Sequence, residues 1–269
     1  MRCEDAGSAH IRLIWARPRT PQRAGQRGPT AQLLVPSGAL SRGRYRWAIL
    51  AAGTAAQAAY AALLIGLPVL APAFRRDFGL SLSDVGLLLA SVGIGQTLTL
   101  LPWGLATDRF AERAVLGIGM LAASAAVAGA AAVSSLAPLV VLLALASGLG
   151  AGVSAASGRA VIAWFAPSER GLALGIRQTA IPIGGAVAGG LLPALGGVQT
   201  SLAVLAGCCF ATALVGIAVL REPPVREPPA TIGLLAPLRD RRIWLLSVGS
   251  SLILVAQLSV LGFLVLFLH

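Results

Sequence analysis

Long apolar segments separated by short polar connectors dominate the chain from about residue 47 onwards. Each segment is close to the roughly 20 residues that an α-helix needs to cross about 30 Å of hydrocarbon. Because lipid offers the backbone no hydrogen-bond partners, we expect these segments to be helices. The pattern therefore predicts an all-α, polytopic membrane protein with seven spans, at residues 47–71, 84–103, 114–133, 137–160, 175–195, 200–220 and 243–268.

The spacing of the segments divides the chain into four parts. Short connectors join the first six segments, so we expect residues 47–220 to pack as one six-helix transmembrane bundle. Residues 221–242 are a Pro- and Arg-rich linker, and residues 243–269 supply a seventh transmembrane helix, the start of a second bundle that is otherwise missing. Residues 1–46 are rich in Arg and Pro without helical periodicity, and we expect a disordered cytoplasmic tail.

The composition excludes a soluble globular protein. Hydrophobic residues make up 57% of the 269 residues and charged residues only 12%, whereas soluble domains carry about 25% charged residues. All 21 basic residues are arginines and the net charge is +11. These arginines lie mainly in the tail and the connectors, where membrane topology explains them, so we expect the lipid bilayer and no nucleic acid as a partner.

The placement of arginine also predicts the orientation. With the N-terminus inside, seventeen arginines of the tail and connectors lie on the cytoplasmic side and two, Arg75 and Arg76, on the other. Cytoplasmic loops carry the excess of basic residues in membrane proteins. We therefore expect a multi-pass protein of the cell (inner) membrane with a cytoplasmic N-terminus.

Two connectors carry motifs. The sequence GLATDRFAER at residues 104–113 resembles the signature connector between the second and third helices of the major facilitator superfamily, with the pattern Gly-x-x-x-Asp-Arg/Lys-x-Gly-Arg/Lys-Arg/Lys. Ala111 and Glu112 depart from that pattern, and the residues that match are Gly104, Asp108, Arg109 and Arg113. The connector between the fourth and fifth segments resembles the family's Pro-x-x-Arg-Gly at Pro167, Arg170 and Gly171.

The resemblance, which covers residues 47–269, implies a function. It implies a membrane transporter, not an enzyme, that moves a small solute by alternating access, with the 104–113 connector as part of a cytoplasmic gate. A different interpretation is a truncated, inactive or regulatory membrane-embedded module that needs a partner bundle, because five expected helices are missing. Uptake of a solute into vesicles would favour the transporter, and binding without flux would favour the module.

Polar residues inside the spans are candidates for the solute cavity. Such residues are costly in lipid and usually face a bundle interior or a watery cavity. The candidates are Gln57, Tyr60, Gln96, Arg177, Gln178 and Gln257. Arg159 and Arg177 lie near helix ends, where they could reach the headgroups or pack in the gate. For Arg177 a polar or anionic solute is the alternative, since a guanidinium binds carboxylate or phosphate through two hydrogen bonds.

The sequence offers little for other chemistry. No carboxylate or histidine lies in the interior of the first six segments, so this part has no evident proton carrier. The three cysteines, of which Cys208 and Cys209 are adjacent, fit no metal site or disulfide framework. We expect no cofactor and no metal.

Overall fold

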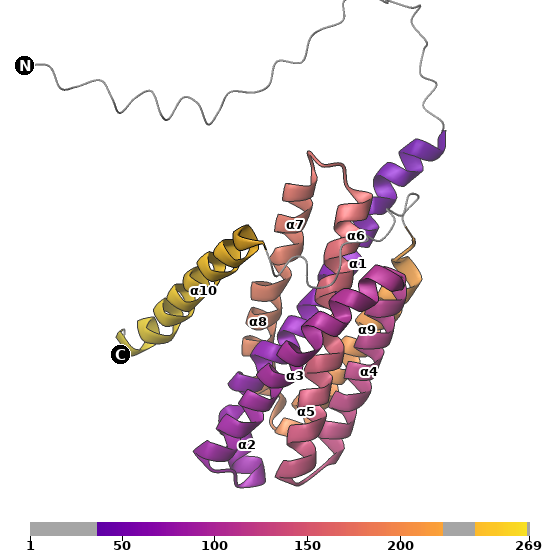
Figure 1. Ribbon diagram of the computed structural model, residues 1–269. Helices are drawn as coiled ribbons and strands as arrows, with labels where there is room; N and C mark the ends of the chain where they lie inside the picture. The colour runs from indigo at the N-terminus through magenta and orange to yellow at the C-terminus, as the bar shows by residue number, and fades with distance from the viewer. Residues whose placement is uncertain (1–36, 223–239, 268–269) are drawn as a thin grey trace, which may run out of the picture. The chain divides into compact units, whose positions relative to one another are not determined.

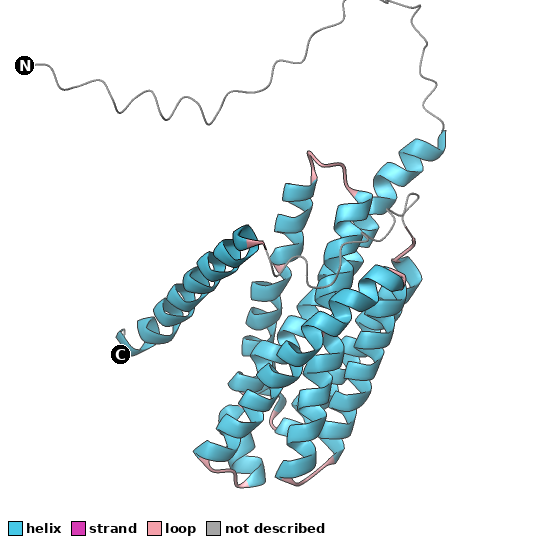
Figure 2. Ribbon diagram, viewed as in Figure 1, coloured by secondary structure: helices cyan, strands magenta, loops and turns pink. Residues whose placement is uncertain are grey.

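The computed structural model describes residues 37–222 and 240–267, without the side chains of residues 37–42 and of much of the last helix. The chain divides into two units, Met1–Leu40 and Ser41–His269, and the second contains nearly all of the described residues. The predicted tail lies largely outside the described residues, as does the predicted linker. Figure 2 shows only helices and loops in the described part of the chain.

The described residues form ten α-helices and one 3-10 helix, joined by short loops (Figure 1). They are α1 (Ser37–Val69), α2 (Ala71–Phe78), α3 (Leu82–Arg109), α4 (Glu112–Ala132), α5 (Leu136–Gly150), α6 (Gly152–Trp164), α7 (Arg170–Gln178), α8 (Ala180–Leu191), η1 (Leu192–Leu195), α9 (Val198–Val219) and α10 (Arg241–Phe267).

The structure confirms an all-α membrane fold. Six helical stretches of the described residues are long and apolar enough to cross a bilayer, and each coincides with one of the first six predicted segments. They are Gly43–Val69, Leu82–Arg109, Glu112–Ala132, Leu136–Trp164, Arg170–Leu195 and Val198–Val219. The seventh segment is helical as α10.

The first helix differs from the expectation at both ends. It begins at Ser37, so residues 37–46 are helical where we expected tail. Hydropathy detects only the part of a helix that lies in lipid, and nothing prevents the helix from continuing into the aqueous phase. After Val69 the chain forms α2, a short helix with Arg75 and Arg76 in its last turn.

The fourth predicted span breaks into α5 and α6 at Ala151. The carbonyl of Gly148 accepts hydrogen bonds from Thr99 Oγ1 and Trp103 Nε1 of α3, both at 2.8 Å. Side-chain donors that enter the backbone ladder in this way bend or interrupt a helix. The break therefore depends on a neighbouring helix and not on the local sequence.

The fifth predicted span breaks into α7 and α8 at Thr179. Pro182 has no N–H to donate to the carbonyl of Gln178, and a proline ring also clashes with the carbonyl four residues before it. Thr179 closes the end of α7 instead, since its backbone N–H lies 3.3 Å from the oxygen of Gly175 and 3.2 Å from that of Ile176. Arg177 and Gln178 thus stand at a helix break inside the span.

Small residues bring the helices of the bundle into close contact. A Cβ atom added at Gly95 of α3 would lie 2.1 Å from the carbonyl oxygen of Ala144 on α5, and one at Gly184 of α8 would lie 2.3 Å from that of Ala58 on α1. Close approach through small residues is a general way in which helices associate in lipid. On α8 the buried small face consists of Ala180, Gly184 and Ala188.

The opposite end of the bundle from the 104–113 connector contains a cap between helices. Asp77 of α2 accepts a hydrogen bond from the backbone N–H of Val198, the first residue of α9, at 3.0 Å. That bond holds the pKa of Asp77 below its usual range, with help from the neighbouring Arg76 and against partial desolvation. An acceptor here also satisfies one of the free N–H groups at the start of α9.

Candidate functional site

Arg177 is, with Glu112, one of the two charged side chains that are buried in the described part of the bundle. It is 9% exposed, and α7 directs its side chain toward α6. Its Nε donates to Ser157 Oγ at 2.8 Å, and its Nη2 donates to the carbonyl of Ser154 at 2.8 Å and to Gln57 Oε1 of α1 at 3.2 Å. Three helices therefore converge on one guanidinium.

The partners of Arg177 are all neutral. None of the ion pairs formed by the described residues includes it. A buried charge is costly unless an opposite charge accompanies it, even when its hydrogen bonds are made. The site thus holds a positive charge that an anion could neutralise.

Another polar group close to this cluster lacks a partner. Thr54 Oγ1, on α1 one turn before Gln57, is buried without a hydrogen bond. α1 meets α6 at this level, since a Cβ at Gly53 would lie 3.2 Å from that of Ser157. Buried polar groups are almost always paired, so this hydroxyl is a second group that a ligand could satisfy.

The other cavity candidates divide into three cases. Gln178 lies at the surface, with Oε1 3.3 Å from Arg177 Nη1. Gln96 is half-buried on α3, and in the described part of the chain no hydrogen bond joins its side chain to the Arg177 cluster. Gln257 lies in α10, but its side chain is outside the described residues.

Tyr60 is packed in the core of the bundle. It is 1% exposed, and its hydroxyl donates to the carbonyl of Ser147 on α5 at 2.7 Å. A Cβ at Gly150 would lie 2.6 Å from its ring. The glycine opposite gives the ring a place in the core, and the cavity role of Tyr60 stays a prediction.

A second charged cluster joins the ends of three helices. Arg159 of α6 pairs with Asp108 in the last turn of α3, and its Nε lies 3.4 Å from Glu112 Oε1 at the start of α4. The side chain of Glu112 is 9% exposed and that of Asp108 is 53% exposed. Arg159 thus holds both sides of the 104–113 connector.

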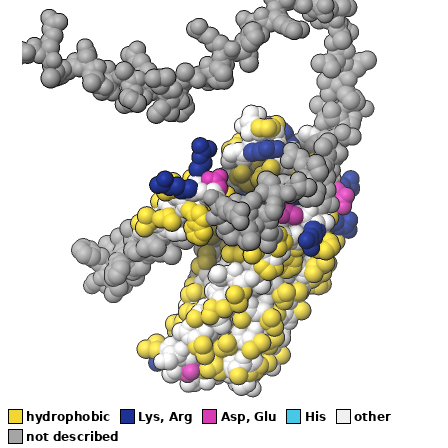
Figure 3. Space-filling view, viewed as in Figure 1, with side chains coloured by type: hydrophobic (Ala, Val, Ile, Leu, Met, Phe, Trp, Pro, Cys, Tyr) yellow, Lys and Arg dark blue, Asp and Glu magenta, His cyan; other side chains and the backbone are white. Residues whose placement is uncertain are grey.

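The remaining motif residues do not join this cluster. Gly104 contributes its carbonyl, which accepts from Thr107 Oγ1 at 2.7 Å. Arg109 and Arg113 are exposed. Figure 3 shows charged side chains gathered at one end of the bundle, with few at the opposite end and mostly hydrophobic side chains between.

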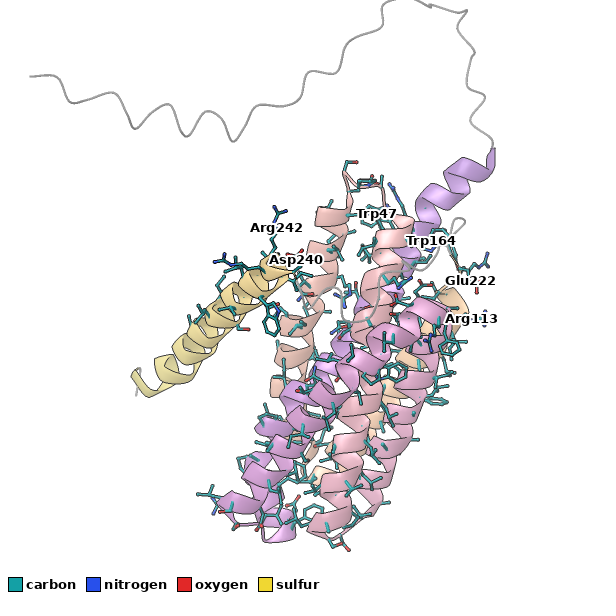
Figure 4. All side chains as sticks on the ribbon, in the orientation of Figure 1. Trp47, Arg113, Trp164, Glu222, Asp240 and Arg242 are labelled. Atoms are coloured by element: carbon teal, nitrogen blue, oxygen red, sulfur yellow. The ribbon has the colours of Figure 1, made fainter. Side chains whose placement is uncertain are left out.

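The 165–171 connector is tied to the start of the first span. Arg46 pairs with Glu169, with Nη2 3.0 Å from Oε1, and the Trp47 and Phe165 rings pack edge to face at 5.3 Å. Arg170 Nε donates to the carbonyl of Phe165 at 3.1 Å, whereas Pro167 and Gly171 are exposed. Figure 4 shows Trp47 and Trp164 at the same end of the bundle as Arg113.

Comparison with known proteins decides the family. The model of the Major Facilitator Superfamily matches residues 65–269. The chain belongs to this superfamily. The motif resemblances therefore occur in a chain that is a member of the superfamily. They lie in the 104–113 connector and at Pro167, Arg170 and Gly171.

Relatives of known sequence support the assignment to this superfamily. An uncharacterized MFS-type transporter of Mycobacterium tuberculosis is 33% identical over 228 residues, which cover 83% of this chain and 51% of the relative. The hexuronate transporter of Bacillus subtilis is 30% identical over 124 residues, 46% of this chain and 29% of that protein. The chain spans about half the length of the mycobacterial relative.

Solved structures agree on the fold. The structure of a bacterial homolog of the human lysosomal transporter Spinster, in an inward-facing and unoccupied conformation, matches with a TM-score of 0.63 and 19% identity, over 72% of this chain and 48% of the other. Its inward-facing and occupied form matches with a TM-score of 0.61 and 17% identity, over 84% and 54%. At this identity the match shows the superfamily fold alone.

Sequence reasoning missed the partners of Arg177, which is buried, and of Arg159, which is partly buried. Ser154 and Ser157 are ordinary small residues in an apolar segment, and nothing in the sequence distinguishes them. Glu112 did carry a signal, because it stands where the superfamily pattern has a basic residue. The structure gives a reason for the departure, since Arg159 supplies the positive charge from another helix.

Proposed function

We propose that the protein is a membrane transporter that moves a small anionic solute by alternating access, and that Arg177 binds the anionic group. We place it in a bacterial inner membrane with its N-terminus in the cytoplasm, where the arginine-rich end of the bundle would lie. Membership of the superfamily supports transport. In alternating access two bundles rock around a site near the middle of the membrane, so a second bundle is part of this proposal.

The proposal that the solute is an anion rests on the burial of Arg177 without a carboxylate partner among the described residues. A fold that only needed a hydrogen-bond donor at this place could use a neutral side chain at lower cost. A guanidinium instead presents a fork that matches carboxylate or phosphate. The Bacillus relative is named for hexuronate, a sugar carboxylate, which fits this class of solute.

The Arg159 cluster fits a gate. Its three charged residues stand on α3, α4 and α6 at the end that we place in the cytoplasm. The more exposed pair, between Arg159 and Asp108, is of a kind that contributes only about 0–1 kcal/mol, which is small enough to be broken in a transport cycle. Conformational equilibria of this kind span only a few kcal/mol, so even such weak pairs shift the populations of the two states.

For the gate we expect Asp108→Asn to slow uptake by about two- to fivefold, and Arg159→Gln to slow it more. The second change is larger because it also leaves the nearly buried carboxylate of Glu112 without its partner. Uptake rates are measured in proteoliposomes, and insertion is checked by the amount of folded protein in the membrane. Arg75→Gln, an exposed arginine on α2, is the matched control, and wild-type rates for Asp108→Asn would count against the gate.

The function itself is tested by counterflow in proteoliposomes that contain the protein at the length its cells produce. Galacturonate and glucuronate are compared with galactose and glucose, which match them in size but lack the carboxylate. We expect exchange of a sugar acid and none of the neutral sugars. Exchange of the neutral sugars would support transport but contradict the proposed site for an anion. Binding of a sugar acid without exchange would favour a membrane-embedded binding module.

A further inference from the structure

An open groove runs along the outside of the bundle where α4 meets α9. It has a volume of about 270 Å³, and its wall consists mainly of Gly117, Ile118 and Leu121 of α4 and Ile217 of α9. At the floor of the groove α4 and α9 are in close contact, since a Cβ at Gly117 would lie 2.5 Å from Ile217 Cγ1. The surface that lines the groove is apolar throughout, and one lining residue, at one end, carries its charge beyond that surface.

That residue is Arg113. It lines the groove and is exposed, and it takes part in none of the ion pairs of the described residues. Arg159 pairs with both carboxylates of the connector, Asp108 and Glu112, so Arg113 has no role within the cluster. Glu222, beyond the end of α9, lies at the same end of the bundle (Figure 4) but forms no ion pair with it either.

The order of the residues fits the geometry of a bilayer. Arg113 stands in the first turn of a transmembrane helix, the level at which lipid headgroups lie. From Arg113 to Leu121 the helix rises about 12 Å, so the apolar part of the groove reaches into the hydrocarbon. A ligand that fits has an anionic end at the membrane surface and an apolar chain that extends inward.

We propose that this groove binds an anionic phospholipid of the surrounding bilayer, with the phosphate on Arg113 and part of an acyl chain along Gly117, Ile118 and Leu121. A guanidinium binds phosphate through two hydrogen bonds, and acyl chains gain free energy for each methylene that they bury. A second copy of the chain fits less well. Copies related by a twofold axis along the membrane normal would hold their Arg113 side chains at the same depth, with like charges facing.

The test is native mass spectrometry of the full-length protein released from nanodiscs that contain equal amounts of phosphatidylglycerol and phosphatidylcholine. We expect wild type to retain phosphatidylglycerol about fivefold over phosphatidylcholine, the effect of one arginine near an anionic headgroup. Arg113→Gln is expected to bring the two lipids to equal retention. Ala114→Phe, which fills the groove without changing a charge, is expected to lower retention of both.

Two control variants match these changes. Arg75→Gln removes an exposed arginine from α2, and Ala125→Phe adds a ring to an exposed position of α4 outside the groove; both should retain lipid as wild type does. Equal retention of the two lipids by wild type, or wild-type behaviour of either groove variant, would overturn the proposal. So would a wild-type dimer that Ala114→Phe dissociates, because the occupant would then be a second copy.

Discussion

Arg177→Gln is expected to weaken binding of the anion that we propose as the solute by about 30-fold or more while leaving the unliganded protein as stable as wild type. Truncating one partner of a buried, hydrogen-bonded charge pair costs about 2–5 kcal/mol of binding free energy. In the unliganded protein the guanidinium faces only neutral oxygens. A buried charge without a counter-charge is costly to the fold, and relief of that cost should offset the hydrogen bonds that are lost, so binding and stability should separate.

The variants are compared by the concentration dependence of counterflow and by the melting temperature of the purified protein. Arg177→Lys keeps the charge but loses the planar fork, and it should fall between wild type and Arg177→Gln. Arg75→Gln controls for the loss of an arginine as such. If Arg177→Gln transports the anion with unchanged apparent affinity, Arg177 is not part of the solute site. The proposal that the protein is a transporter would not be affected by that result.

Gly95→Ala is expected to destabilise the bundle more than any other single methyl group added to α3. The added Cβ would lie 2.1 Å from the carbonyl oxygen of Ala144 and 2.7 Å from Ser147 Oγ. The obstacle is a backbone atom, so α3 and α5 must move apart. That movement would also stretch the bonds from Thr99 and Trp103 to Gly148. Overpacking a core costs typically about 1–3 kcal/mol, and we expect the upper end or beyond.

The control lies on the same helix. Gly93 is exposed and has no atom within 4 Å of an added Cβ, so Gly93→Ala should be neutral or slightly stabilising, because alanine favours helix over glycine. Thermal unfolding and the fraction of monodisperse protein after purification measure both variants. Equal melting temperatures of the two would show that α3 and α5 are not in close contact at Gly95.

The long helical spans could be predicted from the sequence, whereas their interruptions and the short helix α2 could not. Hydropathy averages over about 20 residues and reports the lipid environment of a span. The break at Ala151 depends on Thr99 and Trp103, which are distant in the sequence and reach Gly148 only in the folded bundle. The break at Thr179 had a local signal in Pro182, but proline is common in transmembrane helices and does not by itself mark an end.

The candidate site, like the fold, could be predicted only in part from the sequence. A polar residue in an apolar segment identifies a position worth attention, and Gln57, Arg177 and Gln178 do lie together. The sequence does not reveal which face of a helix meets which neighbour. For this reason the sequence places Tyr60 among the cavity candidates without indicating that its ring is buried in the core.

One turn of α6 connects the two charged clusters. Ser157 accepts from Arg177, and Arg159, two residues further on, holds Asp108 and Glu112. A turn of helix is too stiff to let one of these residues move without the other. If the solute shifts Ser157 when it binds, it must also change the free energy of the ion pairs at the membrane surface. Thermodynamic reciprocity then requires those ion pairs to alter the affinity for the solute by the same factor.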